Sequence, residues 1–159
     1  MSLIEHLERQ IQVLVLAAHD MEEVIAACDA LDREEAPSPL RDALATAIAV
    51  CYARPFSARN TVGPRLSKQW TPASGTPERE IHDWLLHERK KRYAHTDMWA
   101  GRVVLHAGDL ENGFDGLIEI KAPFPRERLI QIRERATCLH EQLMAEAFVV
   151  QGKIVEEAG

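Results

Sequence analysis

A long apolar seam at the start of the chain constrains the fold more than any other feature. Between residues 3 and about 31, apolar side chains recur at alternating steps of three and four: Ile4, Leu7, Ile11, Leu14, Ala18, Met21, Ile25 and Cys28. This spacing places them on one face of a helix that packs along a second helix of nearly parallel axis. The sequence therefore predicts a long N-terminal helix with a helical partner.

Three further helices follow from the same periodicity. One extends from about Pro39 to Ala53 and is ended by Pro55, because a residue before proline avoids the helical conformation. A second begins at Pro77 behind a Thr76 cap and extends to about His95. The last spans about 125–151, and its apolar stripe consists of Leu129, Ile132, Ala136, Leu139, Leu143 and Val150.

The segments between the helices contain turn-forming residues. Residues 54–77 include four prolines and predict a long loop with one short helical turn near Leu66–Trp70. Two strand-forming runs around a turn-rich connector predict a small β-hairpin insertion near residues 102–121. The expected fold class is all-α, an antiparallel helical bundle of four main helices, formed by residues 1–159 as a single domain.

Bulk composition excludes several classes of protein. No apolar run approaches the roughly 18–20 residues of a membrane span, and no signal-like segment opens the sequence, so a cytoplasmic protein with no membrane contact is expected. The three cysteines are far apart and predict free thiols. Because the sequence contains no glycine-rich phosphate loop and no zinc-type cysteine spacing, neither a cofactor nor a metal site is expected.

The middle of this acidic chain is basic. The whole sequence carries a net charge of −6, whereas residues 54–102 contain ten Lys/Arg against five Asp/Glu, a local excess of +5. Four consecutive cations, Arg89 to Arg92, close the third helix just before His95. Such a cluster predicts a local anion-binding site. The alternative is a solvated basic face that complements the negative end of the helix dipole.

Arginine beside histidine suits cleavage of an RNA phosphodiester. Arginine forms two parallel hydrogen bonds to phosphate, and histidine exchanges a proton near neutral pH. On an ideal helix Arg92 and His95 extend the apolar stripe, whereas Arg89 lies about a third of a turn away. Arg89 would meet His95 only if the helix unwound near Tyr93–Ala94, so either arginine remains a candidate.

The motif around this pair resembles that of a known family. Arg89-x5-His95, within Leu85-Leu86-x-x-Arg-x-Lys-x-Tyr-Ala-His-Thr-Asp, resembles the Arg-x4–6-His signature of HEPN domains, and Tyr52-Ala53-Arg54-Pro55-Phe56 resembles a segment of their abortive-infection branch. The resemblance implies a helical homodimer acting as a metal-independent endoribonuclease in a defence or toxin–antitoxin module, with an antitoxin as partner. The alternative is a non-catalytic dimer that binds RNA, nucleotide or a partner protein.

The resemblance also assigns roles to individual residues. Arg89 would contact the scissile phosphate at the dimer seam, His95 would act as acid or base, and Arg92 would replace Arg89 if the register is shifted by one turn. The remaining assignments are RNA binding by Lys90, Lys91, Arg54, Arg59 and Tyr93, and orientation of His95 by Asp97. Lys90 departs from the family pattern, which often has Asn, Asp or His directly after the arginine.

Overall fold

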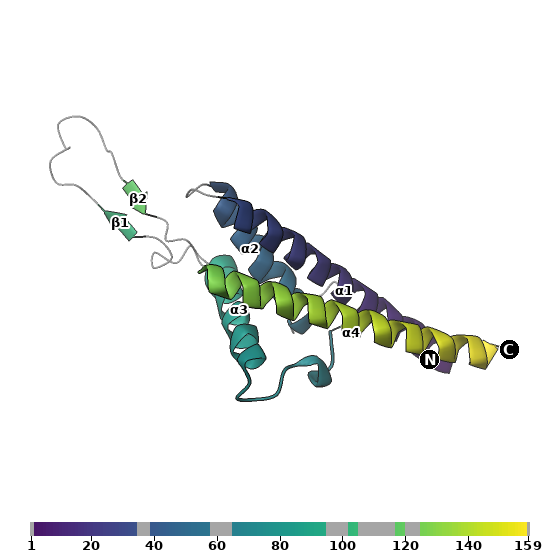
Figure 1. The fold of residues 1–159 in the computed structure, drawn as a ribbon. Coiled ribbons are helices and arrows are strands. Elements are labelled where there is room, and N and C mark those ends of the chain that lie inside the picture. Colours follow the sequence, from purple (N-terminus) through teal and green to yellow (C-terminus); the bar gives the residue numbers. More distant parts are fainter. Residues whose placement is uncertain are drawn as a thin grey trace.

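The computed structural model describes residues 2–34, 39–57, 65–94, 102–104, 117–119 and 125–158. This part of the chain is predominantly helical, which confirms the all-α prediction for it (Figure 1). Its elements are α1 (Leu3–Arg33), α2 (Pro39–Ala53), η1 (Arg54–Phe56), η2 (Lys68–Trp70), α3 (Pro77–Ala94), β1 (Arg102–Val104), β2 (Leu117–Glu119) and α4 (Arg126–Ala158).

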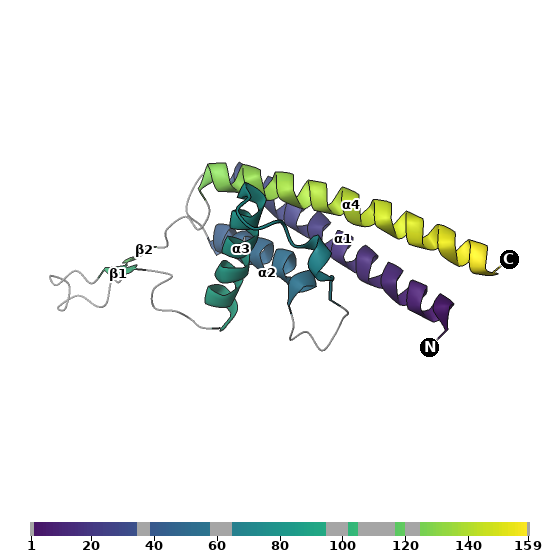
Figure 2. The same ribbon diagram turned by 90° about the horizontal axis from the view of Figure 1, so that it is seen from below.

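The two longest helices form the frame of the fold. α1 and α4 lie side by side and antiparallel, so that the start of α1 and the end of α4 lie at the same end of the molecule (Figures 1 and 2). The predicted seam of α1 faces this contact, with Leu14, Met21 and Cys28 buried and Ile11 and Ile25 half-buried. A cross-helix ion pair joins Arg133 Nε to Asp29 Oδ1 at 2.6 Å. The near-parallel helical partner predicted for the seam is therefore α4.

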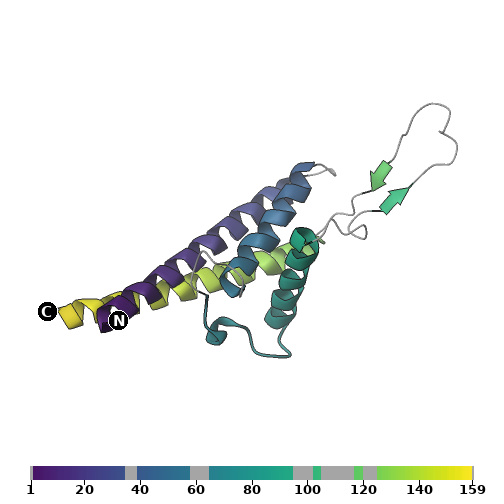
Figure 3. The same ribbon diagram turned by 180° about the vertical axis from the view of Figure 1, so that it is seen from behind.

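The two shorter helices cover one end of this pair. α2 packs on the C-terminal half of α1, and α3 packs on α2 while crossing the other helices (Figure 3). The antiparallel arrangement thus describes α1, α2 and α4, and α3 departs from it. The core lies where the elements meet and includes Tyr52, Ile48 and Leu85, each with no exposed surface.

Local sequence signals fix the helix starts. Ser2 accepts a hydrogen bond from the Glu5 amide at 3.2 Å, while the Glu5 carboxylate accepts one from the Ser2 amide at 2.7 Å, forming a capping box. At α3 the Arg79 amide donates to Thr76 Oγ1 at 3.2 Å, which confirms the predicted cap. The short turn η2 agrees with the helical turn expected near Trp70.

Two features of the chain's second half differ in extent from expectation. α4 continues to Ala158, beyond the predicted end at Gln151, because Ile154 still packs against the core. The strands β1 and β2 pair antiparallel with Arg102 opposite Glu119 and Val104 opposite Leu117. They fall within the segment predicted as a hairpin insertion, and its connector lies outside the described residues.

Candidate functional site

The basic run at the end of α3 follows the buried residue Leu85. Leu85 is fully buried, Arg89 is half-buried and Lys90 is exposed. The backbone is helical through Ala94, so the unwinding near Tyr93–Ala94 that would bring Arg89 toward His95 is not present. His95 itself lies outside the described residues. The preference of an ideal helix for Arg92 over Arg89 as the partner of His95 therefore stays a prediction.

Several residues assigned by sequence fall outside what the structure describes. Arg59, His95 and Asp97 lie beyond the described ranges. The side chains of Lys91, Arg92 and Tyr93 are likewise outside them, although their backbone belongs to α3. Their proposed roles in RNA binding and catalysis remain predictions.

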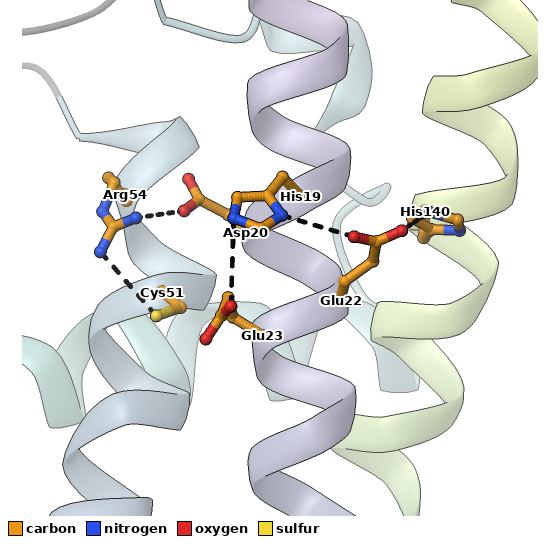
Figure 4. A network of polar contacts seen from close by, with 7 residues as sticks. All are labelled: His19, Asp20, Glu22, Glu23, Cys51, Arg54 and His140. Atoms are coloured by element: carbon orange, nitrogen blue, oxygen red, sulfur yellow. Dashed lines mark hydrogen bonds and ion pairs between the residues drawn. The ribbon is translucent and has the colours of Figure 1, made fainter.

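Arg54, predicted to bind RNA phosphates, is held by a carboxylate of the same chain. In Figure 4 its guanidinium points from η1 toward Asp20 on α1, with which it forms an ion pair. The Asp20 side chain is only 8% exposed, whereas that of Arg54 is 49% exposed. The same guanidinium lies 3.9 Å from Cys51 Sγ. Arg54 thus fastens the end of α2 and η1 to α1.

The Asp20 carboxylate sits in an environment that opposes its charge. Burial raises the pKa of Asp20, and the neighbouring Arg54 guanidinium offsets part of that rise. On the solvent side of α1, Glu22 connects the helix to α4 through His140 Nε2 at 3.2 Å (Figure 4). These polar pairs therefore join neighbouring helices to α1, and they do not form an open anion-binding site.

A buried histidine lies beneath α3, in a position that sequence reasoning missed. His82 is 3% exposed, and its Nδ1 lies 3.2 Å from the hydroxyl of Tyr52 on α2. The ring of Phe56 meets the imidazole edge-on, with centroids 4.6 Å apart. Burial lowers the pKa of His82 from 6.5 to about 4. The imidazole is therefore neutral at physiological pH and accepts a hydrogen bond from Tyr52.

The polar contact continues from Tyr52 toward α4. Burial raises the pKa of Tyr52, and the nearby Arg135 guanidinium opposes the rise by hydrogen bonding and by its charge. Because arginine only donates, the Tyr52 hydroxyl keeps its own proton for His82. Polar groups from α4, α2 and α3 thus lie near one another in the core. No periodicity in the sequence signals this arrangement, since the pairs are brought together only by tertiary packing.

Arg135 also separates two surface pockets. One, of about 430 Å³, is lined by Trp70, Gln142, Glu146 and the turn after η2. The other, of about 350 Å³, lies between α4 and the first turn of α3. Arg135 Nη2 donates to the Trp70 carbonyl at 3.4 Å, while its Nε is buried without a partner among the described atoms. The mixed charges around both pockets select no particular ligand.

Trp70 and Trp84 pack against the core, with the Arg128 guanidinium 5.4 Å from the Trp84 ring centre. Among the described residues, no group of three or more His, Cys, Asp or Glu side chains is arranged to hold a metal ion. No helix in the described part is long and apolar enough to cross a membrane. The described cysteines are free, with Cys28 buried, Cys51 half-buried and Cys138 exposed.

Comparisons with known proteins give no relative. The chain matches no family model, no curated protein and no solved structure.

Proposed function

We propose that this chain is a metal-independent endoribonuclease of the HEPN type that works in a defence or toxin–antitoxin module. The observation that carries the proposal is α3, a continuous helix to Ala94 on which half-buried Arg89 and exposed Lys90 follow the buried Leu85. The basic run Arg89–Arg92 thus belongs to the end of this helix, shortly before His95 in the sequence. A half-buried arginine next to exposed cations is suited to phosphate recognition.

The proposed reaction needs only proton transfer and charge stabilisation. A histidine takes the proton of the 2′-hydroxyl, whose oxygen attacks the adjacent phosphorus, and the bond from phosphorus to the 5′-oxygen breaks. The leaving oxygen receives a proton from a second acid, so the products are a 2′,3′-cyclic phosphate and a 5′-hydroxyl. The arginine guanidinium offsets the additional negative charge that develops on the phosphoryl oxygens.

Two copies of the chain would supply both the acid and the base. In this proposal His95 from each copy faces one cleft, with Arg92 or Arg89 beside it, and Lys90 and Lys91 contact neighbouring phosphates. Arg54 is a weaker candidate for phosphate contact because its charge is already offset by Asp20. An antitoxin would bind to the basic middle segment of this otherwise acidic chain.

A second candidate function is binding of RNA, nucleotide or protein without cleavage. It is favoured by Lys90, which follows Arg89 where the family often has a residue able to accept a hydrogen bond. A lysine there adds affinity for phosphate but cannot accept a proton while it is charged. The two candidates differ in one respect: only the first breaks a phosphodiester bond.

Cleavage of single-stranded RNA by the purified full chain in excess EDTA tests the proposal. Arg89→Ala, Arg92→Ala and His95→Ala are compared with Lys68→Ala, a control that removes an exposed cation of η2. Loss of His95 should lower the rate about 10²- to 10⁴-fold, as expected for a general acid or base, with the control unchanged. Absence of cleavage, or equal cleavage by His95→Ala, would overturn the enzymatic proposal, and RNA binding without cleavage would support the second candidate.

A further inference from the structure

The outward face of α4 near its C-terminus is apolar and lacks a partner among the described helices. Phe148 and Val155 are 67% and 68% exposed, and Val149 is 54% exposed. In Figures 1 and 2 this half of α4, together with the start of α1, extends beyond α2 and α3. Large apolar side chains gathered on one helical face mark an interaction surface more often than chance exposure does.

The face has the spacing of a helix-pairing seam. Ala145, Phe148, Gly152 and Val155 follow one another at steps of three, four and three, so all four project on one side of α4. We call these four residues the α4 seam. It alternates small and large side chains, with Ala145 and Gly152 as the small members.

Gly152 has no explanation among the described residues of one copy. It lies inside a continuous helix, where glycine is less stable than alanine. A Cβ atom added at Gly152 would meet nothing within 4 Å, so no contact within the described part of the chain requires its absence. A bare backbone on an exposed helix is suited to close approach by a large side chain from another molecule.

We propose that a second copy of this chain docks on the α4 seam in antiparallel orientation. In that orientation Phe148 of one copy lies over Gly152 of the other, and Val155 lies over Ala145. Because the contact is two-fold symmetric, each large side chain meets a small one twice. A parallel pairing would place the two Phe148 rings together, leave a void between the two Gly152 residues, and bring two Glu141 carboxylates side by side.

The residues beside the seam carry too little charge to repel a second copy. The positions that flank a helix-pairing seam select partners by opposite charge. Here these positions hold Gln142, Met144, Val149, Gln151 and Glu156, of which one alone is charged. With antiparallel pairing Glu156 lies near Gln142 of the other copy, so no like charges meet.

The area available sets the strength of the dimer. The α4 seam extends over ten helical steps, or about 15 Å. Two helices in contact over that length bury less than the ~1,200 Å² at the lower limit of standard interfaces. A contact this small is typical of weak association, so we expect a dissociation constant in the micromolar range.

This dimer does not depend on the proposed ribonuclease activity and is distinct from a shared RNA cleft. Arg128, which contacts Trp84 of α3, lies 22 residues before the centre of the seam, or about 33 Å along α4. Antiparallel pairing would therefore set the two α3 helices roughly 66 Å apart along the common axis. If one copy pairs both through the α4 seam and through the RNA cleft, each contact joins it to a different second copy.

Sedimentation equilibrium of the full chain, from low micromolar to several hundred micromolar, tests the proposal. The wild-type chain should gain mass by a concentration-dependent association over this range, and Phe148→Lys should raise the dissociation constant of that association at least about tenfold. Ile130→Lys is the matched control, because Ile130 is 52% exposed on the same helix but outside the seam. Its dissociation constant should stay within about twofold of wild type.

Gly152→Leu distinguishes the antiparallel pairing from nonspecific hydrophobic association. Leucine adds apolar surface and favours the helix, so it would increase the affinity of a nonspecific or a parallel association. The antiparallel seam predicts the opposite, a loss of at least about tenfold in affinity, because leucine fills the space that Phe148 occupies. A wild-type chain that stays monomeric, equal effects of Phe148→Lys and Ile130→Lys, or tighter association of Gly152→Leu would each overturn the proposal. His95→Ala should dimerise normally, so failure of the ribonuclease proposal leaves this result intact.

Discussion

The buried His82 imidazole makes the stability of this fold depend on pH in a definite direction. Its folded-state pKa is about 4, because burial between Tyr52 and Phe56 disfavours the charged form. In the unfolded chain the same imidazole has a pKa of about 6.5. Below that value the unfolded state binds a proton that the folded state does not, so stability falls as pH falls.

The size of the effect follows from the two pKa values. Each unit of difference corresponds to about 1.4 kcal/mol. Between about pH 7.5 and about pH 5, where the unfolded chain becomes protonated at this site, His82 should cost about 2 kcal/mol of stability. The loss should approach about 3 kcal/mol once the pH reaches the folded-state pKa.

Urea denaturation at a series of pH values measures this loss. Wild type is compared with His82→Gln, which removes the titration while keeping a polar side chain able to accept a hydrogen bond. The other six histidines are common to both proteins, so the difference between their stability curves isolates His82. The difference should shrink by about 2 kcal/mol as the pH falls from 7.5 to 5. Parallel curves, or an NMR titration of His82 near its ordinary pKa, would refute the assignment of a buried neutral imidazole.

Two further perturbations test the packing. Arg54→Ala leaves the buried Asp20 carboxylate without its partner and should destabilise the fold by about 1–3 kcal/mol. Adding Asp20→Asn to this variant should restore part of the lost stability. Unchanged urea midpoints would contradict a stabilising ion pair between Arg54 and Asp20. Leu139→Ala empties a fully buried position on α4 and should cost about 2–5 kcal/mol. Ile130→Ala, at an exposed position of the same helix, should change stability by less than about 0.5 kcal/mol. Similar losses of stability for Leu139→Ala and Ile130→Ala would contradict the assigned core.

Helix positions could be predicted because periodicity is a local property. The apolar seam from Ile4 to Cys28 predicted α1. The helical spacing of apolar residues, together with Pro55, predicted the observed limits of α2. α4 continues to Ala158, beyond the predicted end at about Gln151. The helix extends further because Ile154 packs against the core, a tertiary contact that local periodicity does not encode.

The polar contacts inside the fold could not be predicted in the same way. Asp20 and Arg54 are 34 residues apart, and Tyr52 and His82 are 30 apart, so neither pair leaves a periodic trace. The family resemblance predicts RNA binding by Arg54, whereas the environment of this side chain depends on how η1 packs against α1. The crossing angle of α3 likewise depends on the packing of side chains from three helices, which spacing along one helix does not encode.

The chemistry of the RNA ends tests the central proposal most directly. A defined single-stranded RNA is incubated with the full chain in EDTA, and the products are identified by mass spectrometry. Attack by the 2′-hydroxyl predicts a 2′,3′-cyclic phosphate and a 5′-hydroxyl, formed by wild type and not by His95→Ala. Intact RNA, products that carry a 3′-hydroxyl and a 5′-phosphate, or cleavage that EDTA abolishes would contradict a metal-independent ribonuclease at the end of α3.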